Sequence, residues 1–236
     1  MPAPQPRAMQ SFPFTMVGFD LDGTLVESHR DLAHAINHAL DKAGRPPVEP
    51  EVVRDLIGGG TARMLERALE RTGGQLPPLE FEQRLGDLLA WYEAHIADET
   101  LPYEGCLVAL DALAERGCTL AVVTNKIENF AVKLLRELGM AERFAVILGG
   151  DTLGPGSAKP APDMIEEAIR RCREAGAAEG RFAMIGDSSY DVRAGQAAGV
   201  PVIALSFGYN DLAADQLGAD AVVDHYEQLV PALERL

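Results

Sequence analysis

The chain has 236 residues, of which 47% are hydrophobic, and this is enough for one sizeable core and a smaller accessory domain. Its formal net charge is -15 and its sequence pI is about 4.7. Because an acidic surface repels nucleic acid and anionic membranes, we expect neither as a partner.

The chain begins with a Pro-rich stretch that lacks the apolar region of a signal peptide. Residues 1–12 are therefore predicted to form a disordered lead-in rather than a signal peptide. No apolar run approaches the ~18 residues that a membrane-spanning helix needs. The three cysteines, Cys106, Cys118 and Cys172, are scattered and form no CxxC pair. This pattern favours buried thiols in a reducing cytoplasm.

An acidic motif follows the first apolar run. The run Thr15–Phe19 is predicted to be a short buried strand, and Asp20 and Asp22 come directly after it. If the extended conformation persists, both carboxylates point to one side of the sheet, and Gly23 allows a tight turn. Two such carboxylates can hold a hard cation and divide nucleophilic and acid/base work. A strand that simply ends in an acidic turn is the alternative.

The next segment, 27–98, is predicted to be all-helical. Its apolar residues follow helical spacing within four stretches, and Gly and Pro clusters separate them. These stretches are residues 32–40, 51–57, 61–71 and 79–96. We therefore predict that a helical cap domain is inserted into a core formed by residues 13–26 and 99–236.

The core is predicted to be α/β, with a Rossmann-like parallel sheet and helices on both faces, because helices and strands alternate along it. Helices are expected at residues 106–116, 128–138, 162–175, 191–198 and 227–235, and strands at 119–124, 144–148, 182–185, 201–205 and 220–223. Ligands bind beyond the carboxyl ends of such strands. Asp20, Thr124 and Asp187 all fall at predicted strand ends.

Four motifs in order along the chain resemble those of the haloacid dehalogenase-like hydrolases, most of which are magnesium-dependent phosphatases. They are FDLDGTL (19–25), VVTNK (122–126), KPAPD (159–163) and IGDSSYD (185–191). Within this superfamily the chain is most similar to phosphoglycolate phosphatases. That similarity rests on LIGGGTARMLERAL (56–69) and AAGVPVIALSFGYN (197–210), which are less specific segments.

The resemblance implies roles for the four motif aspartates. Asp20 is the expected nucleophile, which forms an aspartyl-phosphate, and Asp22 is the expected acid and base. Mg²⁺ would be bound by the side chains of Asp20 and Asp187 and by the main-chain carbonyl of Asp22, with Asp191 as a direct or water-mediated support. The alternative is that Asp187 and Ser188 are only a helix N-cap sequence and that Asp191 is a first-turn helix acid.

Three further residues are expected to bind the phosphate. Thr124 would donate its hydroxyl and Asn125 its main-chain N–H, while Lys159 would hold the phosphate and Asp20 together by its charge. Considered alone, Thr124 is an ordinary β-branched strand residue and Lys159 an ordinary solvated loop lysine. Their positions inside the motifs favour the functional interpretation.

Within the cap, Gly58, Gly59 and Gly60 could form a plain helix-breaking loop, but the matching loop of capped relatives reaches toward the substrate. Arg63 is the only basic residue there and could pair with a substrate carboxylate. A solvent-facing helix arginine is the alternative. His34 and His38 have a zinc-compatible i, i+4 spacing, but no third ligand is evident.

These observations predict a cytoplasmic Mg²⁺-dependent phosphatase, a monomer or homodimer, that acts on a small phosphorylated metabolite. The most favoured substrate is 2-phosphoglycolate. A phosphosugar phosphatase or a sugar-phosphate mutase of the same superfamily is the alternative, and a non-catalytic binding module on this fold is less favoured. A cap of about seventy residues suits a small substrate only by analogy at the level of the fold.

Overall fold

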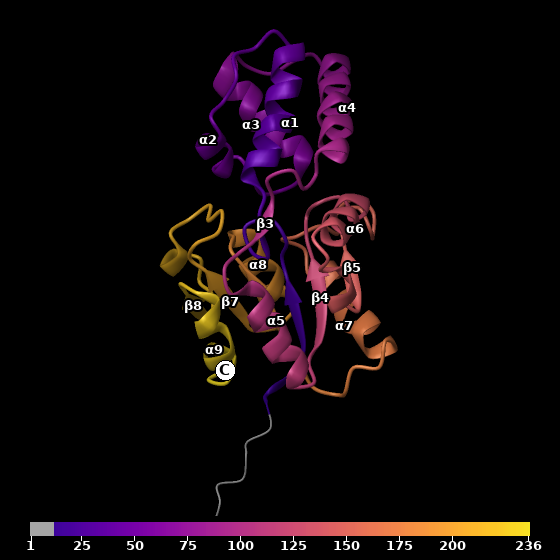
Figure 1. The fold of residues 1–236 in the computed structure, drawn as a ribbon, viewed down its shortest axis with the longest axis vertical. Coiled ribbons are helices and arrows are strands. Elements are labelled where there is room, and N and C mark those ends of the chain that lie inside the picture. The colour runs from indigo at the N-terminus through magenta and orange to yellow at the C-terminus, as the bar shows by residue number, and fades with distance from the viewer. Residues whose placement is uncertain (1–11) are drawn as a thin grey trace, which may run out of the picture.

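The central layer of the core is a parallel sheet of six strands, in the order β5-β4-β1-β6-β7-β8 (Figure 1). The computed structural model describes residues 12–236, so residues 1–11 of the predicted lead-in lie outside the described part. The strands are β1 (Phe14–Phe19), β4 (Thr119–Val123), β5 (Val146–Leu148), β6 (Arg181–Gly186), β7 (Val202–Leu205) and β8 (Ala221–Val223). The predicted α/β fold with a Rossmann-like parallel sheet is confirmed.

The first strand of the chain, β1, occupies the middle of this sheet. It pairs in parallel with β4, where Val17 lies opposite Leu120, and with β6, where Val17 lies opposite Ala183. Val17 belongs to the apolar cluster on one face of the sheet and Met16 to the cluster on the other. A strand buried on both faces needs a continuous apolar run rather than an alternating one, which is what this segment provides.

Helices cover both faces of the sheet, as predicted. Side chains of α5, α6 and α9 join the cluster that contains Val17, whereas side chains of α7 and α8 join the cluster that contains Met16. Their bounds are α5 (Cys106–Glu115), α6 (Glu128–Glu137), α7 (Asp163–Glu174), α8 (Ser189–Ala197) and α9 (Leu229–Leu233). The sheet is therefore the middle of three layers, with its carboxyl edge left open for ligands.

Two core elements are shorter than predicted, and the cap helix expected at 51–57 also ends early, at Arg54. The strand expected at 144–148 begins only at Val146, because Phe144 closes a 3-10 turn by donating its N–H to the Ala141 carbonyl. The helix expected at 227–235 is divided into a 3-10 turn, Tyr226–Gln228, and α9. Pro231 lies in the first turn of α9, where its missing N–H removes no helical hydrogen bond.

A separate helical cap lies above the carboxyl edge of the sheet (Figure 1). It consists of α1 (His29–Lys42), α2 (Pro50–Arg54), α3 (Thr61–Thr72) and α4 (Pro78–Ala94), so the predicted all-helical insertion is confirmed. Helix α1 packs against the other three through an apolar face that includes Leu32, Ile36 and Leu40. No helix in residues 12–236 is both long enough and apolar enough to cross a membrane.

The chain crosses between core and cap through a short ribbon that the sequence did not predict. It consists of β2 (Val26–Glu27) and β3 (Leu101–Pro102), which pair antiparallel. Two-residue strands carry no periodicity, so no sequence pattern could indicate them. The ribbon lies next to the predicted boundaries of the cap, 27 and 98, and we keep those boundaries as a proposal.

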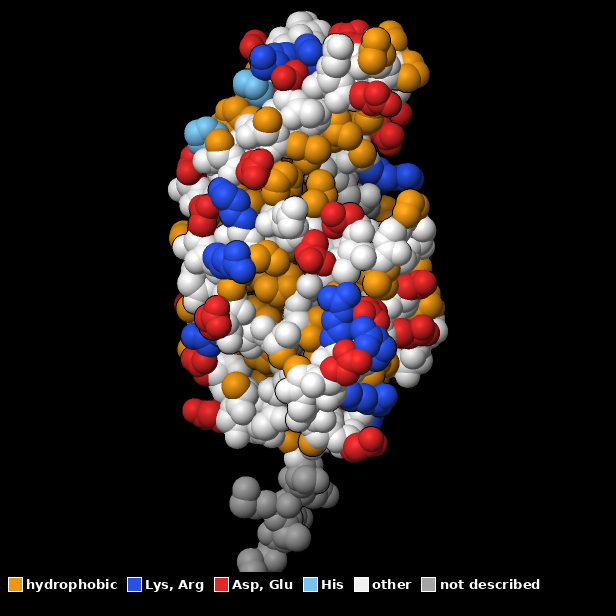
Figure 2. All heavy atoms as spheres, turned by 90° about the vertical axis from the view of Figure 1, so that its right-hand side faces the viewer, with side chains coloured by type: hydrophobic (Ala, Val, Ile, Leu, Met, Phe, Trp, Pro, Cys, Tyr) orange, Lys and Arg blue, Asp and Glu red, His pale blue; other side chains and the backbone are white. Residues whose placement is uncertain are grey.

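Basic side chains do not form one large surface patch on the side of the molecule drawn in Figure 2. Acidic side chains lie among the basic ones over both the core and the cap. This face therefore combines acidic and basic side chains, in a chain whose formal net charge is -15.

A buried carboxylate ties the start of the cap to its end. Asp31, in the first turn of α1, is 1% exposed and accepts hydrogen bonds from the N–H groups of Glu99 and Thr100 and from the Thr100 hydroxyl, at 2.7–3.1 Å. These donors lie where the chain returns to the core. Asp31 thus joins the two cap–core connections, which are far apart in the sequence.

We expect Asp31→Ala to lower the free energy of unfolding by about 2–3 kcal/mol, because buried donors would lose a charged acceptor. Asp41→Ala, at an exposed position of the same helix, is the control and should change it by less than about 0.5 kcal/mol. Urea unfolding followed by the fluorescence of Trp91, the only tryptophan, measures both. Equal midpoints for the two variants would contradict the role given to Asp31.

Candidate active site

A cavity lies between the carboxyl edge of the sheet and the cap. Its empty space, including the part that opens to solvent, is about 590 Å³. Most of the predicted site residues line it: Asp20, Asp22, Gly58, Gly59, Gly60, Thr124, Asn125, Lys159 and Asp187. The structure therefore brings together residues from all four motifs and from the cap loop.

Asp20 and Asp22 reach the cavity from a loop rather than from an extended strand. β1 ends at Phe19, although the Asp20 N–H still bonds to the Ile185 carbonyl at 2.9 Å. The expected period-2 continuation stops there, because the chain turns at Gly23, which has φ +85°. The turn still leaves both aspartates in the lining of one cavity, so the expected proximity holds for a different reason.

Three carboxylates from two strand ends form a tight cluster. One oxygen each of Asp20, Asp187 and Asp191 lies within 4.8 Å of the others, and this group could hold a metal ion. Burial raises the pKa of Asp20 to about 6, against the opposing effect of Lys159. Burial, followed by the charges of Asp191 and Asp20, raises the pKa of Asp187 well above its usual range. Crowded, desolvated carboxylates of this kind favour a bound cation.

Lys159 supplies the positive charge at the centre of this cluster. Its Nζ lies 3.0 Å from Asp20 Oδ1 and 2.6 Å from Asp191 Oδ1, and its side chain is 1% exposed. Asn125 positions the loop of Lys159, because its Nδ2 donates to the Lys159 carbonyl at 2.9 Å. Lys159 is thus a buried, paired cation and not the solvated loop lysine that the sequence left as an alternative.

Asp191 has a structural role as well as a place in the cluster. It accepts hydrogen bonds from the N–H and Oγ of Ser188, at 3.0 and 2.6 Å, and completes a capping box at the start of α8. Ser188 is therefore the N-cap of α8, as the alternative interpretation expected, whereas Asp191 both caps the helix and belongs to the carboxylate cluster. Its second oxygen accepts a hydrogen bond from Lys159.

Other polar groups orient Asp187 and place Thr124. Asp187 accepts hydrogen bonds from the Thr24 hydroxyl at 2.7 Å and from the Tyr209 N–H at 2.6 Å. Thr124 follows β4 and lies in the cavity lining, where its hydroxyl accepts a hydrogen bond from the Lys126 N–H at 3.3 Å. Asp187 is therefore held in one orientation, as the outer partners of a metal ligand usually ensure.

Lys126 and Ser28 also belong to the site, although neither was predicted as a site residue. Lys126 Nζ donates to Asp22 at 2.7 and 3.0 Å, and Ser28 Oγ donates to Asp22 Oδ1 at 2.6 Å. Lys126 is the last residue of VVTNK, so its place in that motif was the available signal. Ser28 lies directly after β2, a strand that the sequence did not predict, so its contact with Asp22 could not be inferred from a predicted element.

The glycine loop of the cap lies over the cavity, with Tyr190 of the core against it. Gly58, Gly59 and Gly60 have φ values of +110°, +76° and +94°, which other residues rarely adopt. A Cβ at Gly59 would lie 2.9 Å from the Tyr190 hydroxyl. Arg63 is exposed and lines a neighbouring groove, not the cavity that contains the acids. The predicted contact of Arg63 with substrate stays a prediction.

Comparison with known proteins agrees with this geometry. The family described as haloacid dehalogenase-like hydrolase matches residues 17–205, which include all four motifs. The chain belongs to the haloacid dehalogenase-like hydrolases.

Several relatives of this hydrolase carry one description. A phosphoglycolate phosphatase of Agrobacterium fabrum is 39% identical over 215 residues, which cover 91% of this chain and 90% of the relative. A phosphoglycolate phosphatase of Chromobacterium violaceum is 38% identical, with coverages of 90% and 93%. The chain is thus a hydrolase that is similar to phosphoglycolate phosphatases.

Solved structures share the whole fold. A predicted phosphoglycolate phosphatase from Haemophilus somnus has a TM-score of 0.84 and 30% identity, and the match covers 95% of this chain and 99% of the other. CbbY from Rhodobacter sphaeroides, solved in complex with phosphate, has a TM-score of 0.75 and 26% identity, with coverages of 94% and 99%. Both likenesses include the cap as well as the core.

We expect Gly208→Ala to destabilise the protein by about 1–3 kcal/mol, since an added methyl group would collide with the Asp187 side chain and the Gly23 carbonyl. Gly86→Ala is the matched control, because it lies in helix α4 with no neighbour near the new methyl group. That change should stabilise by about 0.5–1 kcal/mol. Urea unfolding compares the two, and a Gly208→Ala protein as stable as the parent would contradict the close packing around Asp187.

Proposed function

We propose that this protein is a Mg²⁺-dependent phosphatase that hydrolyses 2-phosphoglycolate through an aspartyl-phosphate intermediate. The observation that carries the proposal is the pair Asp20 and Asp22 in one cavity, with Lys159 against the first acid and Asp187 beside it. The description shared by relatives at 35–39% identity favours 2-phosphoglycolate.

The side chains around the cavity fit a divalent cation. Asp20, Asp187 and Asp191 bring three negative charges to the cluster when ionised, whereas Lys159 brings one positive charge. A single Mg²⁺ would balance the difference, and carboxylate oxygens are its preferred protein ligands. We assign Asp20 and Asp187 as side-chain ligands, the Asp22 carbonyl as a main-chain ligand, and Asp191 as their support. When bound, the ion would neutralise charge on the phosphoryl group.

The proposed reaction has two steps. A carboxylate oxygen of Asp20 attacks phosphorus, the bond from phosphorus to the ester oxygen breaks, and Asp22 gives its proton to that oxygen as the alcohol leaves. A water molecule then attacks the phosphorus of the aspartyl-phosphate, the bond from phosphorus to the Asp20 oxygen breaks, and Asp22 takes a proton of this water. Inorganic phosphate leaves and both aspartates return to their initial state. Lys159, Thr124 and the Asn125 N–H are proposed to bind the phosphoryl oxygens.

One chain carries every residue in this proposal, so either a monomer or a homodimer could act. The three cysteines are free and buried, which agrees with the proposed reducing cytoplasm. A sugar-phosphate mutase would use the same acids but keep the phosphoryl group from water. A panel of phosphomonoesters that includes 2-phosphoglycolate, phosphosugars and nucleotides, assayed with and without Mg²⁺, decides among these substrates.

We expect Asp20→Asn to lower kcat by on the order of a thousandfold or more, because the amide cannot form the covalent intermediate. The fold should be retained, since the two side chains are nearly isosteric. Asp41→Asn, on the exposed surface of the cap, is the control and should retain parental kcat. Turnover of the best substrate by Asp20→Asn within tenfold of the parent would contradict the assignment of the nucleophile.

We expect Asp22→Asn and Asp187→Asn to differ in Mg²⁺ binding. Asp22→Asn should bind Mg²⁺ but not hydrolyse substrate, because its carbonyl remains while no side chain can transfer the proton. Asp187→Asn should bind Mg²⁺ at least tenfold more weakly, because it loses a charged ligand. Titration calorimetry measures both. The roles would be wrongly assigned if Asp22→Asn lost its Mg²⁺ affinity while hydrolysis continued.

A further inference from the structure

Lys126 is a buried cation in the lining of the cavity, next to Asp22, and the proposed reaction gives it no task. Within residues 12–236, the cavity lining contains two basic residues, Lys126 and Lys159. Lys159 is committed to Asp20 and Asp191, on the side where the phosphoryl group is proposed to bind. Lys126 instead contacts Asp22, the proposed proton donor, and is therefore closer to the part of the substrate that leaves.

The contacts of Lys126 hold its ammonium group in place. Its side chain is 4% exposed, and its Nζ lies 2.7 Å from Asp22 Oδ2 and 4.7 Å from the centre of the Tyr92 ring. The carboxylate and the face of the ring both stabilise a buried positive charge. Tyr92 belongs to cap helix α4 and contacts Phe130 of core helix α6, so the cap covers the lysine.

The distances allow Lys126 to contact a group next to the ester oxygen. A proton donor lies about 3 Å from the oxygen that it protonates, and Asp22 lies 2.7 Å from Lys126 Nζ. The ester oxygen therefore lies within about 6 Å of Nζ. In 2-phosphoglycolate the carboxyl carbon is two bonds from the ester oxygen, so a carboxylate oxygen can bridge this space.

We propose that Lys126 binds the carboxylate of the substrate and thereby selects a phosphorylated 2-hydroxy acid over a neutral phosphorylated alcohol. The inference rests on the proposed function, because it takes 2-phosphoglycolate as the substrate. It differs from the prediction made for Arg63, whose side chain is exposed and lines the neighbouring groove. In a buried site a charge-assisted hydrogen bond discriminates strongly between a charged carboxylate and a neutral group. The ammonium group of Lys126 has three N–H donors, which it can share between Asp22 and the substrate.

The test compares two substrates that differ only at the proposed contact. 2-Hydroxyethyl phosphate has a neutral CH₂OH group where 2-phosphoglycolate has its carboxylate. We define the carboxylate preference as kcat/KM for 2-phosphoglycolate divided by kcat/KM for 2-hydroxyethyl phosphate, both at saturating Mg²⁺. Because Lys126 also contacts Asp22, its loss can lower both rates. The ratio cancels that common loss and isolates the contact with the substrate.

Lys126→Met removes the charge and keeps the length of the side chain. We expect it to lower the carboxylate preference about ten- to a hundredfold, mainly through KM for 2-phosphoglycolate. Lys42→Met, at the far end of α1, is the control and should keep the parental ratio, whereas Arg63→Ala tests the competing contact predicted for Arg63. If Lys126→Met does not fold, as judged by circular dichroism, Lys126→Gln is measured in the same way and should show the same fall.

The outcomes separate this inference from the proposed function. A wild-type ratio near one contradicts both, because the enzyme would then not recognise the carboxylate. A high wild-type ratio that Lys126→Met leaves unchanged overturns the inference and leaves the proposed function intact. A ratio that falls in Arg63→Ala but not in Lys126→Met assigns the carboxylate to Arg63 and also overturns it. A fall confined to the Lys126 variants supports it.

Discussion

The buried ammonium of Lys159 lies between two carboxylates, and the rest of the site depends on this contact. Asp20 follows the central strand β1, and Asp191 lies in the first turn of α8, after β6. Without the lysine, like charges would face one another away from water, at a cost of several kcal/mol. Lys159 compensates the charge of Asp191, which is fully buried and uses its second oxygen to cap α8. Because three carboxylates share one lysine, the cluster keeps an excess of negative charge that suits a divalent cation.

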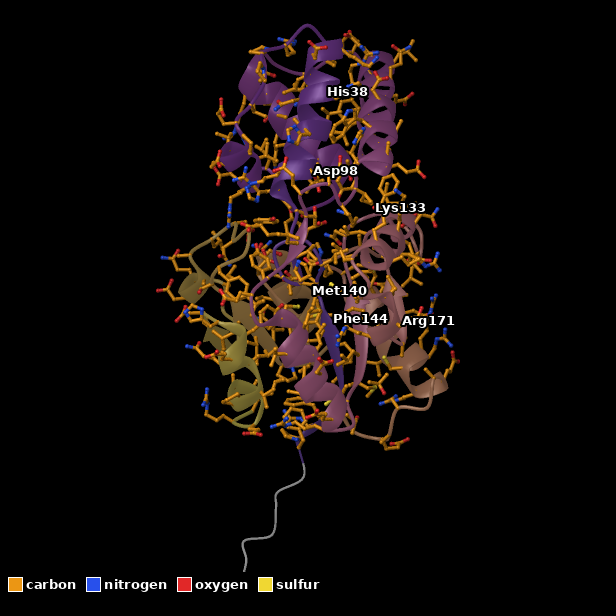
Figure 3. All side chains as sticks on the ribbon, in the orientation of Figure 1. His38, Asp98, Lys133, Met140, Phe144 and Arg171 are labelled. Carbon is orange, nitrogen blue, oxygen red and sulfur yellow. The ribbon has the colours of Figure 1, made fainter. Side chains whose placement is uncertain are left out.

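A second set of contacts joins the proposed acid to the cap and to its connection with the core. Asp22 is bound on one side by Ser28, directly after the cap–core ribbon, and on the other by Lys126, beneath Tyr92 of the cap. At the rim of the cap, core helix α6 contributes Lys133, labelled just below the cap in Figure 3, which donates to the Glu93 carbonyl of α4. Asp22 is therefore oriented by groups that themselves contact the cap or its connection to the core. A change in the position of the cap would alter these contacts.

The sequence predicts the fold and the core motifs because both depend on local patterns. Apolar periodicity identifies β1 and the cap helices, and the spacing of the motifs identifies Asp20, Lys159 and Asp187. The β2–β3 ribbon could not be predicted in this way, because strands of two residues are too short to show periodicity. Lys126 lies within a motif, but its task depends on Asp22, 104 positions away. The same holds for Arg63: its charge suggests a binding role, whereas only tertiary structure reveals that it faces a groove outside the cavity.

The central place of β1 has a consequence for the order in which the molecule can form. The strand is made first, yet its neighbours β4 and β6 begin about 100 and 160 residues later in the chain. During synthesis, this apolar segment stays unpaired while the helices of the cap, whose contacts are more local, emerge and fold. The insertion thus delays closure of the sheet. A nascent chain of this kind presents an unpaired apolar strand for longer than one whose central strand is made last, and that interval is when association with other unfolded chains competes with folding.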